Sequence, residues 1–225
     1  HAMAPAILLL LTRIGIPVST TFLVLSAFAS TIVLEKMLVK SIMGYGMAAV
    51  IAYVLWIVIS KCINEKFDHP THPKAWRIAQ WLTTGFLWYT WVSHDMANIA
   101  VFLPRELPVE MLIGVMAVCT ILLFYIFYHK GGKIQKIVLN KTGTRYVRSA
   151  TIIDFIYAFV LLYFKQYNDI PMSTTWVFVG LLCGRELAIA TMNKEYKLGY
   201  VFPLIGKDFL KMISGLLIFE LLIKA

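Results

Sequence analysis

Long apolar runs recur along this 225-residue chain, and they restrict its fold more than any other feature. A run of about 20 predominantly apolar residues is long enough to cross a bilayer as a helix. Such runs lie at Met43–Ser60, Gln80–Leu103 and Leu107–His129, with a slightly shorter one at Asp208–Lys224. Composition agrees, since 60% of residues are hydrophobic and 15% are charged, against about 25% charged in soluble domains. The sequence therefore predicts an all-α polytopic membrane protein, which excludes an ordinary soluble domain.

Two further apolar regions are interrupted by a polar break. Pro5–Leu34 contains Arg-Ile-Gly-Ile-Pro at 13–17, and Thr151–Leu187 contains Lys-Gln-Tyr-Asn-Asp-Ile-Pro at 165–171. Glycine or proline after a polar cluster ends one helix and starts another. We therefore expect each region to form a broken helical hairpin, which is either a pair of spans with a tight turn or a re-entrant hairpin.

The charges sort by side if each broken region returns to the face from which it entered. The loops 61–79, 129–150 and 191–207 then hold 13 Lys and Arg, whereas 35–42, 104–106 and the C-terminus hold 4. The positive-inside rule puts the richer set in the cytoplasm. The net charge of +9 is thus interpreted as a topology signal and not as a nucleic-acid footprint. We expect a multi-pass protein of the inner or plasma membrane.

A short motif occurs twice, once in each broken region. Ile-Pro-Val-Ser-Thr-Thr at 16–21 returns as Ile-Pro-Met-Ser-Thr-Thr at 170–175, with five of six positions identical. An odd number of predicted spans separates the copies, so the two hairpins would enter from opposite faces. This pattern indicates an inverted-topology repeat, which is the plan of many secondary transporters.

Each copy has the composition of a helix start. Proline fits the first turn of a helix, and the following Ser and Thr can cap it. Hydroxyls and free backbone N–H groups at the positive end of a helix dipole suit an anion. The sequence therefore predicts an oxyanion site lined by Ser19, Thr20 and Thr21 from one copy and by Ser173, Thr174 and Thr175 from the other.

The run at 80–103 carries a carboxylate well inside the apolar stretch, at Asp95. A charge at that depth costs about 2.5–3.5 kcal/mol and is by default a functional residue. Asp95 and Asn98 share a helix face, and their oxygens suit a hard cation such as Na⁺. The amide N–H₂ group of Asn98 can also donate a hydrogen bond to an anion. His94 is an alternative proton carrier, because its unperturbed pKa is near 6.5. Asp154 is a weaker candidate of the same kind.

These residues resemble the inorganic phosphate transporter (PiT) family. That family has two inverted halves, each with a G-A-N-D-x-A-N motif and a later P-V-S-T-T-H motif. The matching segments here are 17–21, 92–98 and 171–175. In 92–98 the Asp, Ala and Asn of the motif are present, whereas its Gly, Ala and Asn are replaced by Val92, Ser93 and His94. The His that closes the second motif is Phe22 in one copy and Trp176 in the other. A complete pair of halves would place another Asp/Asn motif before residue 1, so the resemblance implies that the first half is incomplete.

The resemblance implies a cation-coupled symporter of phosphate, with no cofactor and with Na⁺ or H⁺ as coupling ion. It implies a division into 1–42 (remainder of the first repeat), 43–79 (connecting span and cytoplasmic loop) and 80–225 (second repeat). Asp95 and Asn98 would bind the cation, and Asn98 with the two hydroxyl clusters would bind the anion. Alternatives are a sulfate or other oxyanion permease, a non-transporting membrane subunit, and a homodimer that completes the site.

An intramembrane enzyme is the rival from another class. Ser19 or Ser173 with His94 and Asp95 contains the parts of a nucleophile–base set. A duplicated Ser-Thr-Thr has no meaning for one nucleophile, so the sequence predicts that the chain is not an enzyme.

Overall fold

The structure is a computed structural model of the chain. It describes residues 3–14, 19–25, 28, 30–62, 73–130, 147–167 and 169–192, with the isolated positions 199, 203, 206, 207, 209, 210 and 213. The predicted span at Asp208–Lys224, the loop residues 63–72 and 131–146, and Pro17 and Val18 of the first motif therefore lie largely or wholly outside the described residues.

The described part of the chain is helical and contains no strand, so the predicted all-α class is confirmed there. Among the described residues, four helices are long and apolar enough to cross a membrane, namely α3 over 31–59, α6, α8 and α9. The elements in chain order are α1 (Met3–Ile14), α2 (Thr20–Leu25), α3 (Thr31–Cys62), α4 (Pro73–Asp95), α5 (Ala97–Ala100), α6 (Val109–Tyr128), α8 (Val147–Tyr167) and α9 (Thr174–Met192).

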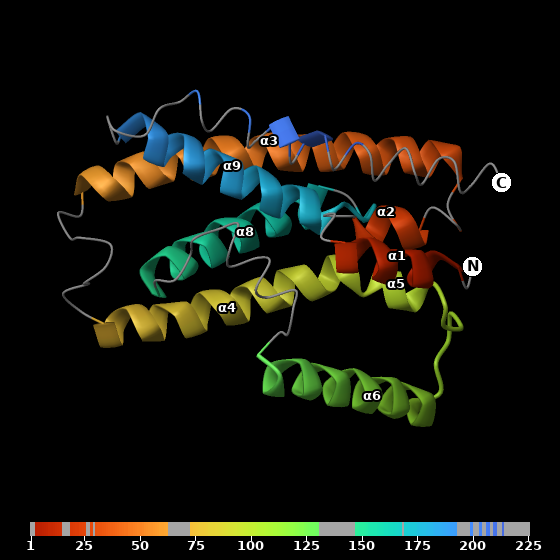
Figure 1. Ribbon diagram of the computed structural model, residues 1–225. Coiled ribbons are helices and arrows are strands. Elements are labelled where there is room, and N and C mark those ends of the chain that lie inside the picture. The colour runs from red at the N-terminus through yellow and green to blue at the C-terminus, as the bar shows by residue number, and fades with distance from the viewer. Residues whose placement is uncertain are drawn as a thin grey trace.

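The long helices lie side by side and alternate in direction along the chain (Figure 1). The closest partners are not consecutive: α9 packs along α3, and α8 packs along α4. Both of these pairs are parallel, whereas α8 and α9 run in opposite directions (Figure 1). The short helices α1 and α2 lie at the end of the bundle where α3 begins and α4 ends (Figure 1).

Small residues explain the tight packing of α9 on α3. Gly180 and Gly184 form a Gly-x-x-x-Gly pair on α9, and an added Cβ would overlap the carbonyl oxygen of Tyr45 or Ala49, respectively. On the facing side of α3, Ala48 and Ala52 are fully buried. Small residues at four-residue spacing let two membrane helices approach closely enough for their backbones to touch.

Polar contacts accompany the packing of α8 on α4. The Thr84 hydroxyl donates to Oδ2 of Asp154 at 2.6 Å, and Nε2 of His94 lies 2.9 Å from the carbonyl oxygen of Leu161. Because a carbonyl only accepts, that nitrogen carries a proton. Hydrogen bonds of this kind between membrane helices contribute about 0.6–2 kcal/mol each.

Two predicted boundaries are wrong. Residues 35–42, expected as a loop, are helical and belong to α3, which runs for 32 residues. The run at 80–103 is not one span: α4 begins earlier, at Pro73, and ends at Asp95. A one-residue turn at Met96 separates Asp95 from the short α5; Met96 keeps helical backbone angles (φ −60°, ψ −25°), and its N–H donates to the Val92 carbonyl at 2.9 Å. The first boundary was placed wrongly because the charges of Lys36 and Lys40 favour a loop when tertiary packing is not known.

The two broken regions differ in the structure. α8 and α9 have 21 and 19 residues and are each long enough to span a membrane, which corresponds to the pair-of-spans alternative. The first region forms α1 and α2, which have 12 and 6 residues. The predicted re-entrant geometry and the inverted relation between the regions stay predictions.

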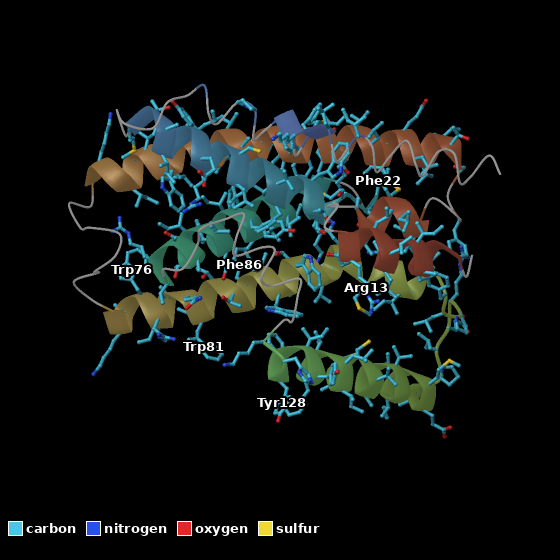
Figure 2. The ribbon with its side chains drawn as sticks, viewed as in Figure 1. Arg13, Phe22, Trp76, Trp81, Phe86 and Tyr128 are labelled. Carbon is cyan, nitrogen blue, oxygen red and sulfur yellow. The ribbon has the colours of Figure 1, made fainter. Side chains whose placement is uncertain are left out.

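Helix α6 lies outside the α3–α4–α8–α9 group, and none of its residues is buried (Figure 1). Its mean hydropathy is the highest of the candidate spans. Figure 2 shows Tyr128 on α6 and Trp81 on α4, and both side chains are largely exposed, at 74% and 76%. A helix that is apolar on all sides is typical of a membrane span that faces lipid.

Candidate functional site

The two copies of the Ser-Thr-Thr motif have the same local structure. Ser19 Oγ accepts the backbone N–H of Phe22 at 3.2 Å, and Ser173 Oγ accepts that of Trp176 at 3.2 Å. In both copies the serine carbonyl also accepts the first i→i−4 bond of the helix: Leu23 N–H donates to the Ser19 carbonyl, and Val177 N–H donates to the Ser173 carbonyl. The prediction that these hydroxyl residues cap helices is confirmed for both serines, which begin α2 and α9.

The role expected for proline needs correction in the second copy. Pro171 lies two residues before the cap Ser173, so it is outside the first turn of α9. The helix begins at Thr174 because Ser173 is its N-cap: Ser173 Oγ accepts the N–H of Trp176, the third residue of the helix. Pro17, its counterpart, lies outside the described residues.

Asp95 bonds to the second motif through Thr174. The Thr174 hydroxyl lies 3.1 Å from Oδ2 and 3.4 Å from Oδ1 of Asp95, and Asn98 Nδ2 donates to Oδ1 at 3.2 Å. The buried Tyr157 hydroxyl donates to the Thr174 carbonyl at 2.8 Å, which ties α8 to the same turn. The structure therefore brings together three predicted site residues from α4, α5 and α9.

The two motif copies meet through the residues that follow them. The rings of Phe22 and Trp176 lie 5.7 Å apart, centroid to centroid, and both side chains are buried. Figure 2 shows Phe22 on the side of α2 that faces α9. Ala97 and Val101, which flank Asn98, pack against the same apolar cluster. Segments near residues 20, 97 and 175, far apart in sequence, thus converge at one place in the bundle.

The hydrogen bonds leave complementary groups for a ligand. The cap bonds of Ser19 and Ser173 use a lone pair of each hydroxyl oxygen and leave its proton to donate elsewhere. Thr174, by contrast, uses its proton on Asp95 and keeps oxygen lone pairs. Asn98 Oδ1 is buried and has no hydrogen-bond partner among the described residues. The arrangement therefore offers O–H donors to an anion and uncommitted oxygens to a cation.

The remaining predicted site residues are placed as follows. Thr21 is buried, whereas Thr20 and Thr175 are half-buried. His94 is buried and bonds to α8, so the hypothesis that it carries a proton stays a prediction. Asp154 bonds to Thr84 between α4 and α8, outside the group around Asp95.

Arg185 and Glu186, which are adjacent on α9, form an ion pair. Nη1 of Arg185 lies 2.7 Å from Oε1 of Glu186. The guanidinium also lies over the ring of Trp56, 5.1 Å from its centroid. The pair therefore links α9 to α3 and has a structural role.

Sequence reasoning missed the two residues of α3 that hold the segment leading to α9. Lys40 is only 3% exposed, and its Nζ donates to the carbonyl of Ile170 at 2.7 Å. Ser41 Oγ accepts the backbone N–H of Ser173 at 2.9 Å and donates to the Met37 carbonyl at 2.7 Å. The sequence contained one signal for Lys40, namely a lysine within an otherwise apolar stretch. The assignment of 35–42 to a loop prevented its recognition as a buried helical residue.

Comparison with protein-family models, with curated proteins and with solved structures finds no match to this chain. The resemblance to the phosphate transporter family accordingly stays a prediction that rests on the motif residues.

Proposed function

We propose that this chain is a cation-coupled secondary transporter of an inorganic oxyanion, with phosphate as the first substrate to test. The observation that carries the proposal is the hydrogen bond from Thr174 to Asp95. It joins a hydroxyl motif at a helix start to an acidic residue beside the one-residue turn at Met96, within a helical membrane protein. Interrupted helices whose N-termini meet at polar side chains are where secondary transporters bind substrate and coupling ions.

The anion and the cation would use different atoms of the site. Hydroxyl protons of Ser19 and Ser173, with the first-turn N–H groups of α2 and α9, suit a tetrahedral oxyanion. Thr20, Thr21 and Thr175 are further hydroxyls on these turns. The carboxylate of Asp95, with Oδ1 of Asn98 and Oγ1 of Thr174, suits a hard cation that prefers oxygen ligands.

Coupling follows from charge. An anion next to the ionised Asp95 is repelled unless a cation lies between them, so each ion raises the affinity of the site for the other. The two parallel pairs, α3 with α9 and α4 with α8, provide units that would move against each other. Asp95 belongs to one pair and Thr174 to the other, so this motion would open and close the site between them.

Uptake into proteoliposomes tests the proposal. The purified chain is reconstituted, and uptake of labelled phosphate and of labelled sulfate is measured with a sodium gradient, with a proton gradient and with neither. We expect cation-driven uptake by the wild type and at least a tenfold loss in Asp95→Asn, because a neutral amide no longer attracts the cation. Asp154→Asn is the matched control, since it removes a carboxylate outside the group around Asp95, and it should retain uptake.

Other outcomes identify the alternatives. Uptake of sulfate without phosphate would make the chain a permease of another oxyanion, and dependence on protons alone would favour H⁺ as coupling ion. Equal uptake by wild type and Asp95→Asn would remove Asp95 from the mechanism. No uptake of either anion under any gradient would favour a non-transporting membrane subunit or a chain that needs a partner.

A further inference from the structure

A buried ammonium group lies beside the segment that leads into the candidate site. Lys40 is 3% exposed, although Lys36, one turn earlier on the same helix, is exposed to solvent or lipid. The Lys40 ammonium donates to the Ile170 carbonyl at 2.7 Å. Burial of a charge is costly, and a lysine inside a membrane helix is by default associated with a substrate or ion pathway.

The neighbouring residue fixes the same segment at a second point. Ser41 accepts the N–H of Ser173 at 2.9 Å, so α3 holds both ends of the four-residue segment 170–173. The next residue is Thr174, whose hydroxyl bonds to Asp95. One short stretch of chain therefore connects the ammonium of α3 to the carboxylate of α4.

The charges around this segment have a definite arrangement. Asp169 is exposed and attracts the Lys40 ammonium from the start of the segment. The N-terminus of α9 adds positive potential on the side of Lys40, because the helix dipole is positive there. Asp95 is the negative group at the other side. An oxyanion at the start of α9 would be attracted by the Lys40 ammonium and by the N-terminus of α9, and repelled by the carboxylates of Asp95 and of the exposed Asp169.

We infer that Lys40 is a specificity-determining residue of the site, which supplies the positive charge against which the oxyanion binds. This inference rests on the proposed function, since it assigns the residue that offsets the charge of the proposed substrate. Lys40 also positions the start of α9 through its hydrogen bond to Ile170. The electrostatic role and the positioning role can be separated, because a neutral N–H donor at position 40 keeps the hydrogen bond and removes the charge.

The test measures initial rates of phosphate uptake by the reconstituted full chain as a function of phosphate concentration. Lys40→Gln keeps an N–H donor for the Ile170 carbonyl without the charge, Lys40→Met removes both, and Lys40→Arg keeps both. We expect KM to rise about tenfold or more in the Gln and Met variants, and to stay within about threefold of wild type in the Arg variant. Lys36→Met, which removes an exposed charge from the same helix, should leave KM unchanged.

The outcomes separate the charge from the structural role. Wild-type KM in Lys40→Gln, with a defect in Lys40→Met, would overturn the inference and leave Lys40 as a positioning residue. A lower maximal rate with unchanged KM in all variants would also overturn it. Thermal unfolding of each variant in detergent reports folding independently of transport. If the wild type takes up neither phosphate nor sulfate, the proposed function itself fails. If the wild type transports phosphate and Lys40→Gln has the same KM, only the inference about Lys40 fails.

Discussion

Thr174 is the residue at which the two kinds of chemistry in the candidate site meet. It begins α9 directly after the cap Ser173, and its hydroxyl bonds to Asp95 while its carbonyl accepts from Tyr157. Hydrogen bonds to a charged acceptor contribute about 1.5–3 kcal/mol. The orientation of Asp95 therefore depends on a side chain 79 residues away in sequence.

Thr174→Val removes this hydroxyl and keeps the shape of the side chain. Because a cation ligand and a bond to Asp95 are lost together, we expect the cation concentration for half-maximal uptake to rise about tenfold. Thr174→Ser should behave like wild type. Thr191→Val is the matched control, since Thr191 lies near the other end of the same helix, where its hydroxyl donates to the Leu187 carbonyl and lies 3.4 Å from the Tyr53 hydroxyl. A Thr174→Val protein with unchanged cation dependence would show that this oxygen is not a ligand.

At the scale of elements, the parallel pair of α3 and α9 is the most closely packed unit of the bundle. Gly180 and Gly184 on α9 lie directly against the backbone of α3, at Tyr45 and Ala49. The arrangement places Lys40 and Ser41 beside the start of α9, since the two helices run parallel and Gly180 lies against Tyr45, a turn or two further along each helix. The contacts that hold the approach to Thr174 are thus a consequence of this helix pairing.

Gly184→Ala tests the pairing. The added Cβ would overlap the Ala49 carbonyl oxygen, and the two helices would have to separate. We expect a loss of about 1–3 kcal/mol in the free energy of unfolding, as for other overpacked sites, measured by thermal unfolding in detergent.

Gly46→Ala is the control on α3, because a Cβ at that position meets nothing within 4 Å. It should be neutral or stabilising by up to about 1 kcal/mol through helix propensity. Equal unfolding midpoints for Gly184→Ala and Gly46→Ala would contradict the close approach of α3 and α9.

At the scale of the whole molecule, successive long helices alternate in direction (Figure 1), and the assignment of one end of the bundle to the cytoplasm stays a prediction from charge. The start of α4 and the turn after α5 lie at opposite ends of α4 (Figure 1). Lys74 and Arg105, which mark these two ends, are both exposed. The first belongs to the set of loops that the positive-inside rule assigns to the cytoplasm, and the second to the opposite set.

Single cysteines at these positions test the topology. After replacement of the three native cysteines, Lys74→Cys should react with an impermeant maleimide only from the cytoplasmic side, and Arg105→Cys only from the outside. The measurement uses intact cells and inverted vesicles. Labelling of both positions from one side would refute the alternating arrangement.

The sequence alone determined the membrane class, the helical fold and the polar residues worth testing. Apolar length and the cost of an unpaired backbone in lipid leave few alternatives to helices. The helix starts at Ser19 and Ser173 were also predictable, because a capping bond spans only three residues. These features depend on local chemistry, which a sequence carries in full.

Only the tertiary structure decided which distant residues share the site. The contact of Phe22 with Trp176, the bond from Thr174 to Asp95 and the burial of Lys40 all depend on pairings between helices that are not neighbours in sequence. Hydropathy assigned Lys40 to a loop because it weighs a charge without its partners. The side chain is instead held inside the bundle by the carbonyl of Ile170, 130 residues later, and that contact exists only once α9 has packed on α3.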